Sequence, residues 1–252
     1  MSKPNNSRAK SRKPGSSAIP AAGTGIPMQS QRGQGEPLNP DLADRARFAL
    51  EDLIVTLELE PGSRWSELQL SDRIGIGRTP VREALQRLEA DSLVRILPRQ
   101  GVEITEVNVA HQMLMLEVRR VLERLIAQGA ASRAAPSERE ALLHMADRLE
   151  SLAAGDILPF LHYHYEIKRF LAMCARNPYA GAAIAPMHAM SRRFYFLHYR
   201  LMHDMPLAAG LHAAVLRAVA VGEAAQATAA ADRLMDYVED LTRDTVLQRD
   251  KG

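Results

Sequence analysis

Three polar side chains share one face of a predicted helix that begins near Thr79. Thr79, Arg82 and Gln86 recur at i, i+3 and i+7, and this spacing aligns them along one side of a helix. Arg78 precedes them in the turn. The planar guanidinium of Arg donates paired hydrogen bonds to phosphate oxygens or to guanine O6 and N7. The arrangement predicts contact with a DNA groove; the alternative is that these side chains are ordinary solvated helix charges.

Two further candidates lie in the connection Pro98-Arg99-Gln100-Gly101, which predicts a hairpin tip. Arg99 and the flexible Gly101 are expected to reach the DNA backbone or the minor groove beside the helix. By contrast, Arg87 lies four residues after Glu83, so we expect it to form an intrahelical ion pair and to play no part in binding.

Clustered histidines give the only hint of metal or catalytic chemistry. The chain has eight His, all after residue 107, and six of them lie between His162 and His212. His162 and His164 are two residues apart, which places them on different helix faces. The single cysteine, Cys174, excludes a cysteine-based zinc site. We therefore expect structural or surface histidines, with no catalytic residue, no metal and no cofactor.

The elements that position these residues are predicted from residue 42 onward. Apolar residues recur with a helical period over 42–57, and Glu60-Pro61-Gly62 ends that helix. Ser66 with Gln69 three residues later predicts a capping box for a short helix near 67–74.

A third helix is predicted to begin at Thr79-Pro80, as N-cap and first helical residue. Its buried stripe is expected to comprise Val81, Ala84, Leu85 and Leu88. The period then changes to about two, which predicts strands over Leu93–Leu97 and Val102–Thr105. This order of helices and hairpin is that of a winged helix-turn-helix.

Beyond Asn108, a predicted N-cap, the apolar pattern is helical throughout. The predicted helices span 109–131, 137–153, 158–175, 179–204, 207–221 and 224–246. Pro186 lies inside the fourth of these helices, where we expect a kink. Together they suit an all-helical antiparallel bundle, so the fold class is mostly α. We expect three regions: 1–36, 37–107 and 108–252.

Composition limits the function classes. The chain has 252 residues, of which 46% are hydrophobic and 25% charged, and this fits globular domains. Residues 1–36 are basic, rich in Ser, Gly, Pro and Asn, and without an apolar pattern, which predicts a disordered arm. Whether that arm touches phosphates or has no role is left open. No apolar run is long enough for a membrane span, and no secretion signal is recognised, so we expect a soluble cytoplasmic protein.

Net charge by itself does not predict DNA binding. The net charge is +2, and residues 42–105 hold nine Arg and no Lys against eleven Asp and Glu. The arrangement of the arginines carries the prediction instead.

The stretch Pro61–Gly101 resembles the winged helix of GntR-family bacterial transcription regulators. Arg78–Glu89, RTPVREALQRLE, matches the family motif R-T-P-V-R-E-A-L-x-R-L-E almost completely. Gly77 departs from the usual Ser or Thr, and Ser92 from the usual Gly. The resemblance implies DNA contact for Arg78, Thr79 and Arg82, and for Gln100 and Gly101 in the wing.

The helical half resembles the FCD effector-binding domain of the FadR-like branch of that family. Typical members hold a metal with an Asp, a His four residues later and two His on later helices. Here those positions are occupied by His164, Lys168, His212 and Leu234. Because a Lys ammonium would repel a divalent cation, we expect no metal.

The resemblance also suggests what replaces the metal. Lys168 is expected to offer its charge to a small organic acid, with a bidentate clamp from Arg119 and further contacts from His164 and His212. The alternative is that Lys168 extends to solvent and the site is vestigial. If Lys168 points inward, it needs an anion, either a ligand or an internal partner such as Glu123.

These expectations combine into a homodimeric regulator that binds double-stranded operator DNA, acts as a repressor by analogy, and responds to a carboxylate. Two alternatives stay open. One is a metal-dependent enzyme built on the bundle; the other is a protein-binding adaptor with an appended winged helix.

Overall fold

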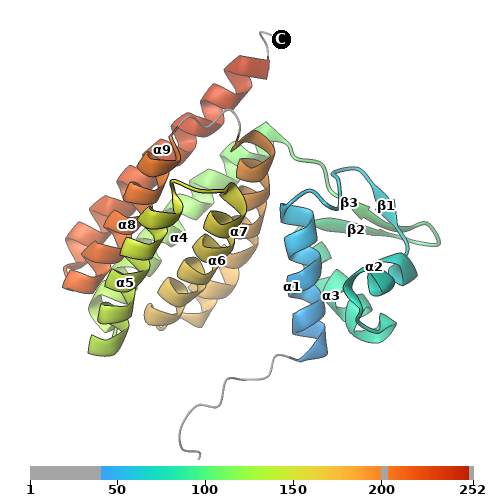
Figure 1. Cartoon of the computed structure of the whole chain (residues 1–252), viewed down its shortest axis with the longest axis horizontal. Coiled ribbons are helices and arrows are strands. Elements are labelled where there is room, and N and C mark those ends of the chain that lie inside the picture. The colour runs from blue at the N-terminus through green and yellow to red at the C-terminus, as the bar shows by residue number, and fades with distance from the viewer. Residues whose placement is uncertain (1–40, 200–203, 250–252) are drawn as a thin grey trace, which may run out of the picture. The chain divides into compact units, whose positions relative to one another are not determined.

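A computed structural model describes residues 41–199 and 204–249. These residues belong to one compact unit, and the arm predicted over residues 1–36 lies outside the described residues. The chain is mostly helical, with a winged helix-turn-helix at the N-terminal side of a helical region (Figure 1). The predicted fold class is therefore confirmed. In the two described ranges, no helix is both long and apolar enough to cross a membrane.

The winged helix comprises three helices and three short strands. They are α1 (Leu42–Val55), β1 (Arg64–Trp65), α2 (Glu67–Ile74), α3 (Arg78–Ala90), β2 (Val94–Leu97) and β3 (Gly101–Ile104). The strand β3 lies between β1 and β2 and pairs antiparallel with both. A two-residue strand is too short to show an alternating pattern, so β1 was not predicted; its pairing with β3 defines it.

Local capping explains where α2 and α3 begin and end. Ser66 and Gln69 form the predicted capping box, with Ser66 Oγ accepting from the Gln69 amide at 3.1 Å. Gly75, at φ 66°, ends α2 in the left-handed conformation. The helix α3 begins at Arg78 with Gly77 as N-cap, so the prediction that Thr79 is the N-cap is wrong by two residues. Pro80 is tolerated because amides in the first turn have no intrahelical acceptor.

Two backbone positions shape the wing. Gly101 has φ 90°, and a Cβ atom there would lie 2.5 Å from the carbonyl oxygen of Trp65. The glycine is thus required by the close approach of β1 and β3, rather than only by flexibility. Ser92 has φ 61°, a left-handed conformation that glycine adopts more readily. Ser92, which departs from the Gly that the family resemblance implies, thus holds a conformation that favours glycine.

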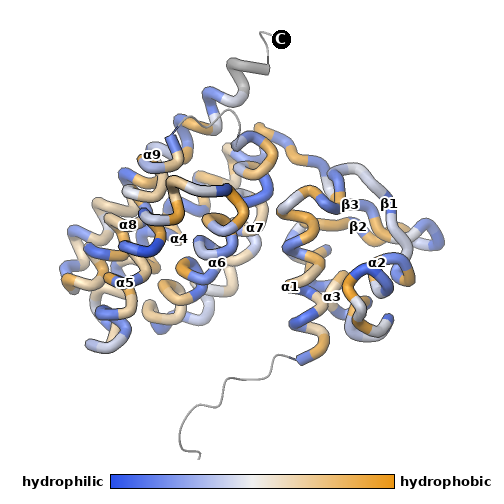
Figure 2. The backbone as a smooth tube through the Cα atoms, viewed as in Figure 1, coloured by the Kyte–Doolittle hydropathy of each residue, from blue (hydrophilic) through white to orange (hydrophobic). Residues whose placement is uncertain are grey.

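The apolar stripe of α3 is buried as predicted, and it packs on α1. Val81, Ala84, Leu85 and Leu88 are buried, and they share a core with Leu50 and its neighbours on α1. Figure 2 shows the alternation of apolar and polar residues along the two helices. Because this stripe faces inward, the opposite face of α3 is left to solvent.

Six further helices form the helical region. They are α4 (Val109–Arg133), α5 (Pro136–Leu152), α6 (Ile157–Cys174), α7 (Pro178–His198), α8 (Met205–Val221) and α9 (Ala224–Arg249). Asn108 caps α4 as predicted, accepting from the His111 amide at 3.1 Å. Pro186 lies inside α7 as predicted. The helix α7 ends at His198, and Asp204 is the N-cap of α8, so the predicted helix over 179–204 is wrong at Tyr199 and Asp204; residues 200–203 lie outside the described residues.

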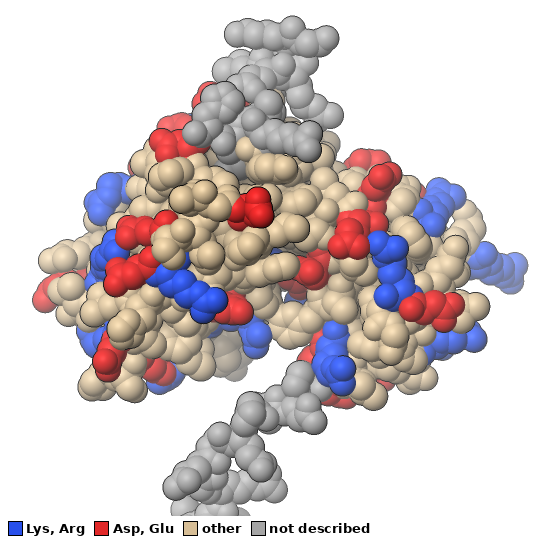
Figure 3. All heavy atoms as spheres, in the orientation of Figure 1, with Lys and Arg blue, Asp and Glu red and all other residues tan. Residues whose placement is uncertain are grey.

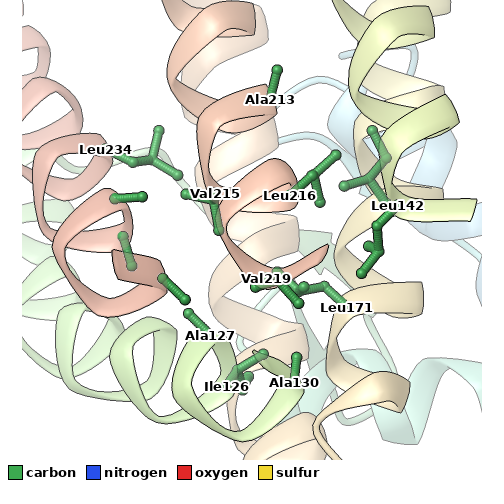
Figure 4. Close-up of a cluster of buried hydrophobic side chains, with 14 of the residues drawn as sticks. Ile126, Ala127, Ala130, Leu142, Leu171, Ala213, Val215, Leu216, Val219 and Leu234 are labelled. Atoms are coloured by element: carbon green, nitrogen blue, oxygen red, sulfur yellow. The ribbon is translucent and has the colours of Figure 1, made fainter. Parts of the chain in front are cut away.

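The helices pack around one apolar core. The helix α4 packs against α9, and α5 packs against α8. Figure 4 shows Leu142, Leu171, Leu216 and Val219 meeting in this core, and all four are buried. Each such side chain contributes about 1.5–3 kcal/mol of hydrophobic stabilisation. This framework holds α4, α6 and α7 close together, and these helices carry the buried charges described below.

Candidate nucleic-acid interface and buried polar cluster

The outer face of α3 carries the four residues predicted to meet DNA. Arg78, Thr79, Arg82 and Gln86 are all exposed, and they lie opposite the buried stripe. Arg78 belongs to the helix as its first residue, rather than to the preceding turn. A helix N-terminus also attracts anions through its free amides and its dipole. The face therefore combines side-chain donors with a favourable backbone terminus.

Arg82 has a partner that the sequence pattern did not reveal. Its Nε and Nη2 atoms donate to the carboxylate of Glu67, the first residue of α2, at 3.1 and 2.7 Å. These hydrogen bonds hold the pKa of Glu67 below its usual value. The pair orients the guanidinium and places one carboxylate beside the exposed face of α3 that is predicted to meet DNA.

The wing presents two of its three predicted residues to solvent. Arg99 and Gln100 are exposed, while Gly101 is half-buried at the start of β3. Gln100 Oε1 accepts from Arg64 at 3.4 Å. Figure 3 shows basic side chains projecting from the part that holds β2, β3 and α2, with acidic side chains between them.

Arg87 does not pair with Glu83, so that prediction is wrong. Its Nη1 atom lies 2.6 Å from Asp44 Oδ1 on α1. The packing of α3 on α1 brings this acid closer than the neighbour in the same helix. Arg87 remains away from the Arg82 face, so it suits a control.

A buried polar cluster joins α4, α6 and α7. Glu123 lies at its centre and accepts from Lys168 Nζ at 2.8 and 3.0 Å. Arg119 donates to Glu123 Oε1 at 3.1 Å and to Ser191 Oγ at 2.9 Å. His188 Nε2 lies 2.9 Å from the same carboxylate. Lys168 points inward and is only 4% exposed, which contradicts the alternative in which it extends to solvent.

The charges in this cluster do not balance. Burial by itself would raise the pKa of Glu123, but Lys168, His188 and Arg119 together hold it well below its usual value. Burial lowers the pKa of His188 to about 4, so its imidazole is neutral at pH 7. Burial also lowers the pKa of Lys168, and the carboxylate of Glu123 opposes that shift. With Lys168 charged, two cations, Arg119 and Lys168, share one carboxylate. The sequence suggested Glu123 as an internal partner, whereas His188 and Ser191 carried no local signal.

The other two predicted residues lie beside this cluster and do not join its hydrogen bonds. The rings of His164 and His212 are 4.4 Å apart in an edge-on contact. Neither ring nitrogen of His164 has a hydrogen-bond partner among the described residues. Burial keeps the pKa of both histidines well below the usual value. They line a cavity of only about 30 Å³, room for one water molecule.

The residues at the implied metal positions do not fit a metal. Lys168 is bound to Glu123, and Leu234 is buried in the apolar core. Asp232 and Asp236, the nearest acids on α9, are engaged by Arg120 and Arg124. Over residues 41–199 and 204–249, no group of three potential ligands converges.

A larger cavity of about 390 Å³ lies where α1 meets α6 and α7. Lys168 and His188 line it from the buried cluster, and Arg47 and Phe48 line it from α1. Arg169 also lines the cavity, with its guanidinium 5.0 Å from the ring centre of Phe48 and 5.6 Å from that of Tyr165.

Comparisons with known proteins extend over most of this architecture. The family model described as "Bacterial regulatory proteins, gntR family" matches residues 42–104, and the FCD domain model matches residues 114–237.

An uncharacterized HTH-type transcriptional regulator of Agrobacterium vitis, in the TAR-I ttuE-ttuC' intergenic region, is 35% identical over 110 residues, covering 44% of this chain and 64% of that protein. The HTH-type transcriptional repressor RspR of Escherichia coli strain K12 is 29% identical over 105 residues, covering 42% of this chain and 44% of that protein. The chain thus spans less than two thirds of the length of these relatives.

The solved structure of E. coli McbR/YncC has a TM-score of 0.72 at 17% identity, covering 82% of this chain and 99% of that one. A likeness at this identity supports the fold alone.

Proposed function

Because the chain belongs to the gntR family of bacterial regulatory proteins, we propose that it is a cytoplasmic, DNA-binding transcription regulator rather than an enzyme. Operator contact is assigned to the winged helix over 37–107, and dimerisation and effector binding to the helical domain over 108–252. The observation that carries the proposal is the exposed face of α3, with Arg78, Thr79, Arg82 and Gln86.

Groove recognition follows from that geometry. The helix α3 exposes donors suited to phosphates and base edges along one side, and the wing adds Arg99, Gln100 and Gly101 next to it. Phosphate contacts position the domain, while base contacts from Arg82 and Gln86 would supply sequence preference.

A homodimer is supported by an unpartnered apolar stripe on α4. Leu114, Val118, Val121 and Leu125 recur at i, i+4, i+7 and i+11, and between 42% and 65% of each residue is exposed. Exposed apolar side chains at heptad spacing suit packing against the same helix of a second copy. Two winged helices would then bind two half-sites.

A small organic acid is the proposed effector. Arg119 and Lys168 share the single carboxylate of Glu123, so the cluster retains one positive charge that an anion would balance. His164 and His212, which the sequence also predicted to contact the effector, lie beside the cluster at a cavity of only about 30 Å³. The similarity to a protein named as a repressor, RspR, supports repression as the mode of action.

Electrophoretic mobility shift tests the proposal. DNA from upstream of the protein's own coding region should shift at two salt concentrations, with affinity falling as salt rises. Carboxylates added to the complex should release the DNA. Equal affinity for unrelated DNA of the same length, or no shift at low salt, would contradict operator binding.

A further inference from the structure

We propose that the cavity between α1, α6 and α7 is a binding site for a small carboxylate with an apolar body, and that its occupancy sets operator affinity. This proposal rests on the proposed function and specifies where the effector of that function binds. The cavity volume of about 390 Å³ lies in the range of small-molecule sites.

The cavity inside the helical bundle that His164 and His212 line is much smaller. The cavity beside His164 and His212 measures about 30 Å³, so an organic acid does not fit there without separation of the helices. Of the four residues predicted to bind effector, only Lys168 lines the larger cavity. A ligand in the larger cavity would thus reach the buried cluster of Lys168, Arg119 and Glu123 from the side that faces α1.

The charges around the larger cavity favour an anion. Asp44 and Glu51 line it, but Asp44 pairs with Arg87, and Glu51 pairs with Arg192. Arg169 has no carboxylate partner among the described residues and is held by the faces of Phe48 and Tyr165. A ligand carboxylate would find Arg169 at the mouth and the excess charge of the Lys168 cluster at the floor.

The remaining lining favours an apolar body of modest size. Phe48, Met173 and Ile184 contribute apolar surface, and the small residues Gly181 and Ala185 leave the space open. A bare inorganic anion would leave this surface uncovered, whereas an aromatic or aliphatic acid would bury it.

The position of the cavity links the ligand to the winged helix. One wall belongs to α1, which packs on α3, and the other belongs to α6 and α7. A ligand that touches both walls stabilises the arrangement described here over any other arrangement. Operator DNA and ligand then change each other's affinity by the same factor.

Four single variants of the full chain test the site. Arg169→Gln removes the unpaired cation. Ala185→Trp fills the cavity from an exposed position on α7. Arg148→Gln is the matched control, because Arg148 also stacks on a tyrosine, Tyr163, at 4.4 Å but does not line the cavity. His164→Leu probes the bundle interior. Circular dichroism and thermal melting confirm that each variant is folded.

Calorimetric titration uses a panel of aliphatic and aromatic monocarboxylates, with benzoate and its neutral analogue benzamide as the reference pair. We expect benzoate or another acid of the panel to bind the wild type and the corresponding amide not to bind. Arg169→Gln should weaken binding about tenfold or more, as for loss of a charged hydrogen bond. Ala185→Trp should abolish binding and the ligand's effect on operator DNA. Arg148→Gln and His164→Leu should leave ligand binding and the ligand's effect on operator DNA unchanged.

Two results would overturn the site while keeping an acidic effector: undiminished binding in Ala185→Trp and Arg169→Gln, or loss of binding in His164→Leu alone. Failure of every acid to bind the wild type would instead overturn the proposed effector, and this site with it.

Discussion

Arg82 on α3 and Glu67 at the start of α2 form a forked ion pair, with Arg82 Nη2 lying 2.7 Å from Glu67 Oε2. The pair joins the two helices of the helix-turn-helix at the surface predicted to meet DNA. It orients the arginine before binding and sets a carboxylate where phosphates would approach. Its two members therefore have opposite expected effects on DNA affinity.

Removal of the arginine should weaken specific binding. Arg82→Ala leaves the buried stripe of α3 untouched, so the fold should persist while operator affinity falls by about 1–3 kcal/mol. Arg87→Ala is the control, because Arg87 pairs with Asp44 away from this face. Fluorescence anisotropy at fixed salt measures both. Unchanged affinity in Arg82→Ala would remove the residue from the interface.

Neutralising the carboxylate should strengthen non-specific binding. Glu67→Gln frees Arg82 to neutralise one more phosphate, so the salt dependence of binding to random DNA should steepen by about one ion. The ratio of operator to random-DNA affinity should fall, because the arginine loses its fixed orientation. Glu58→Gln is the matched control, since Glu58 pairs with Arg73 at 2.9 Å elsewhere in the winged helix. A flatter salt dependence in Glu67→Gln would contradict this account.

Acid should destabilise the fold through the buried histidines. The pKa of His188 falls from 6.5 to about 4 on burial. Below pH 6.5 the unfolded chain therefore takes up a proton that the folded chain refuses. Stability is thus lost as pH falls from about 6.5 to 4, by on the order of 3 kcal/mol for this group.

The variant His188→Gln separates this contribution from others. A glutamine amide can still donate to Glu123 but does not titrate, so urea unfolding between pH 7 and pH 4 should show a shallower loss of stability. The slope should not vanish, because burial also lowers the pKa of His164 and His212. If the free energy of unfolding falls equally with pH in wild type and variant, His188 does not contribute to the loss of stability in acid.

No metal should be retained at the predicted ligand positions. Lys168 is bound to Glu123 and Leu234 is buried, so two of the four positions hold no ligand. Elemental analysis of dialysed protein should give well under one equivalent of zinc, nickel or manganese. One retained equivalent would refute this prediction, and His164 and His212 would then be the first residues to substitute.

The α4 stripe should carry the dimer. Val121→Glu brings two carboxylates together across a symmetric contact, so the dimer dissociation constant should rise about a hundredfold. Operator affinity should fall with it. Leu143→Glu on α5, at a residue 44% exposed, is the control. Sedimentation velocity reports the populations, and a dimer that persists in Val121→Glu would locate the interface elsewhere.

Local patterns in the sequence were sufficient to predict the helices and the two longer strands, β2 and β3, of this protein. The Ser66–Gln69 capping box, the stripe from Val81 to Leu88 and the Asn108 cap all involve residues within one or two turns of each other. Such features depend on helix period and on terminal hydrogen bonds, which a short segment encodes by itself. The motif over Arg78–Glu89 likewise identified the winged helix directly.

Tertiary structure decided the partners of the charged residues. Arg82 pairs with a residue 15 positions away, Arg87 with one 43 away and Lys168 with one 45 away. Coulombic attraction and desolvation act through space, so the nearest acid after packing is the partner, regardless of its place in the chain. The same holds for the cavity beside Arg169, whose walls come from helices far apart in the sequence. Sequence by itself thus determined which residues carry charge and on which helix face they lie. Only the packing of α1, α4, α6 and α7 decided which of those charges form pairs and which, among the described residues, have no partner.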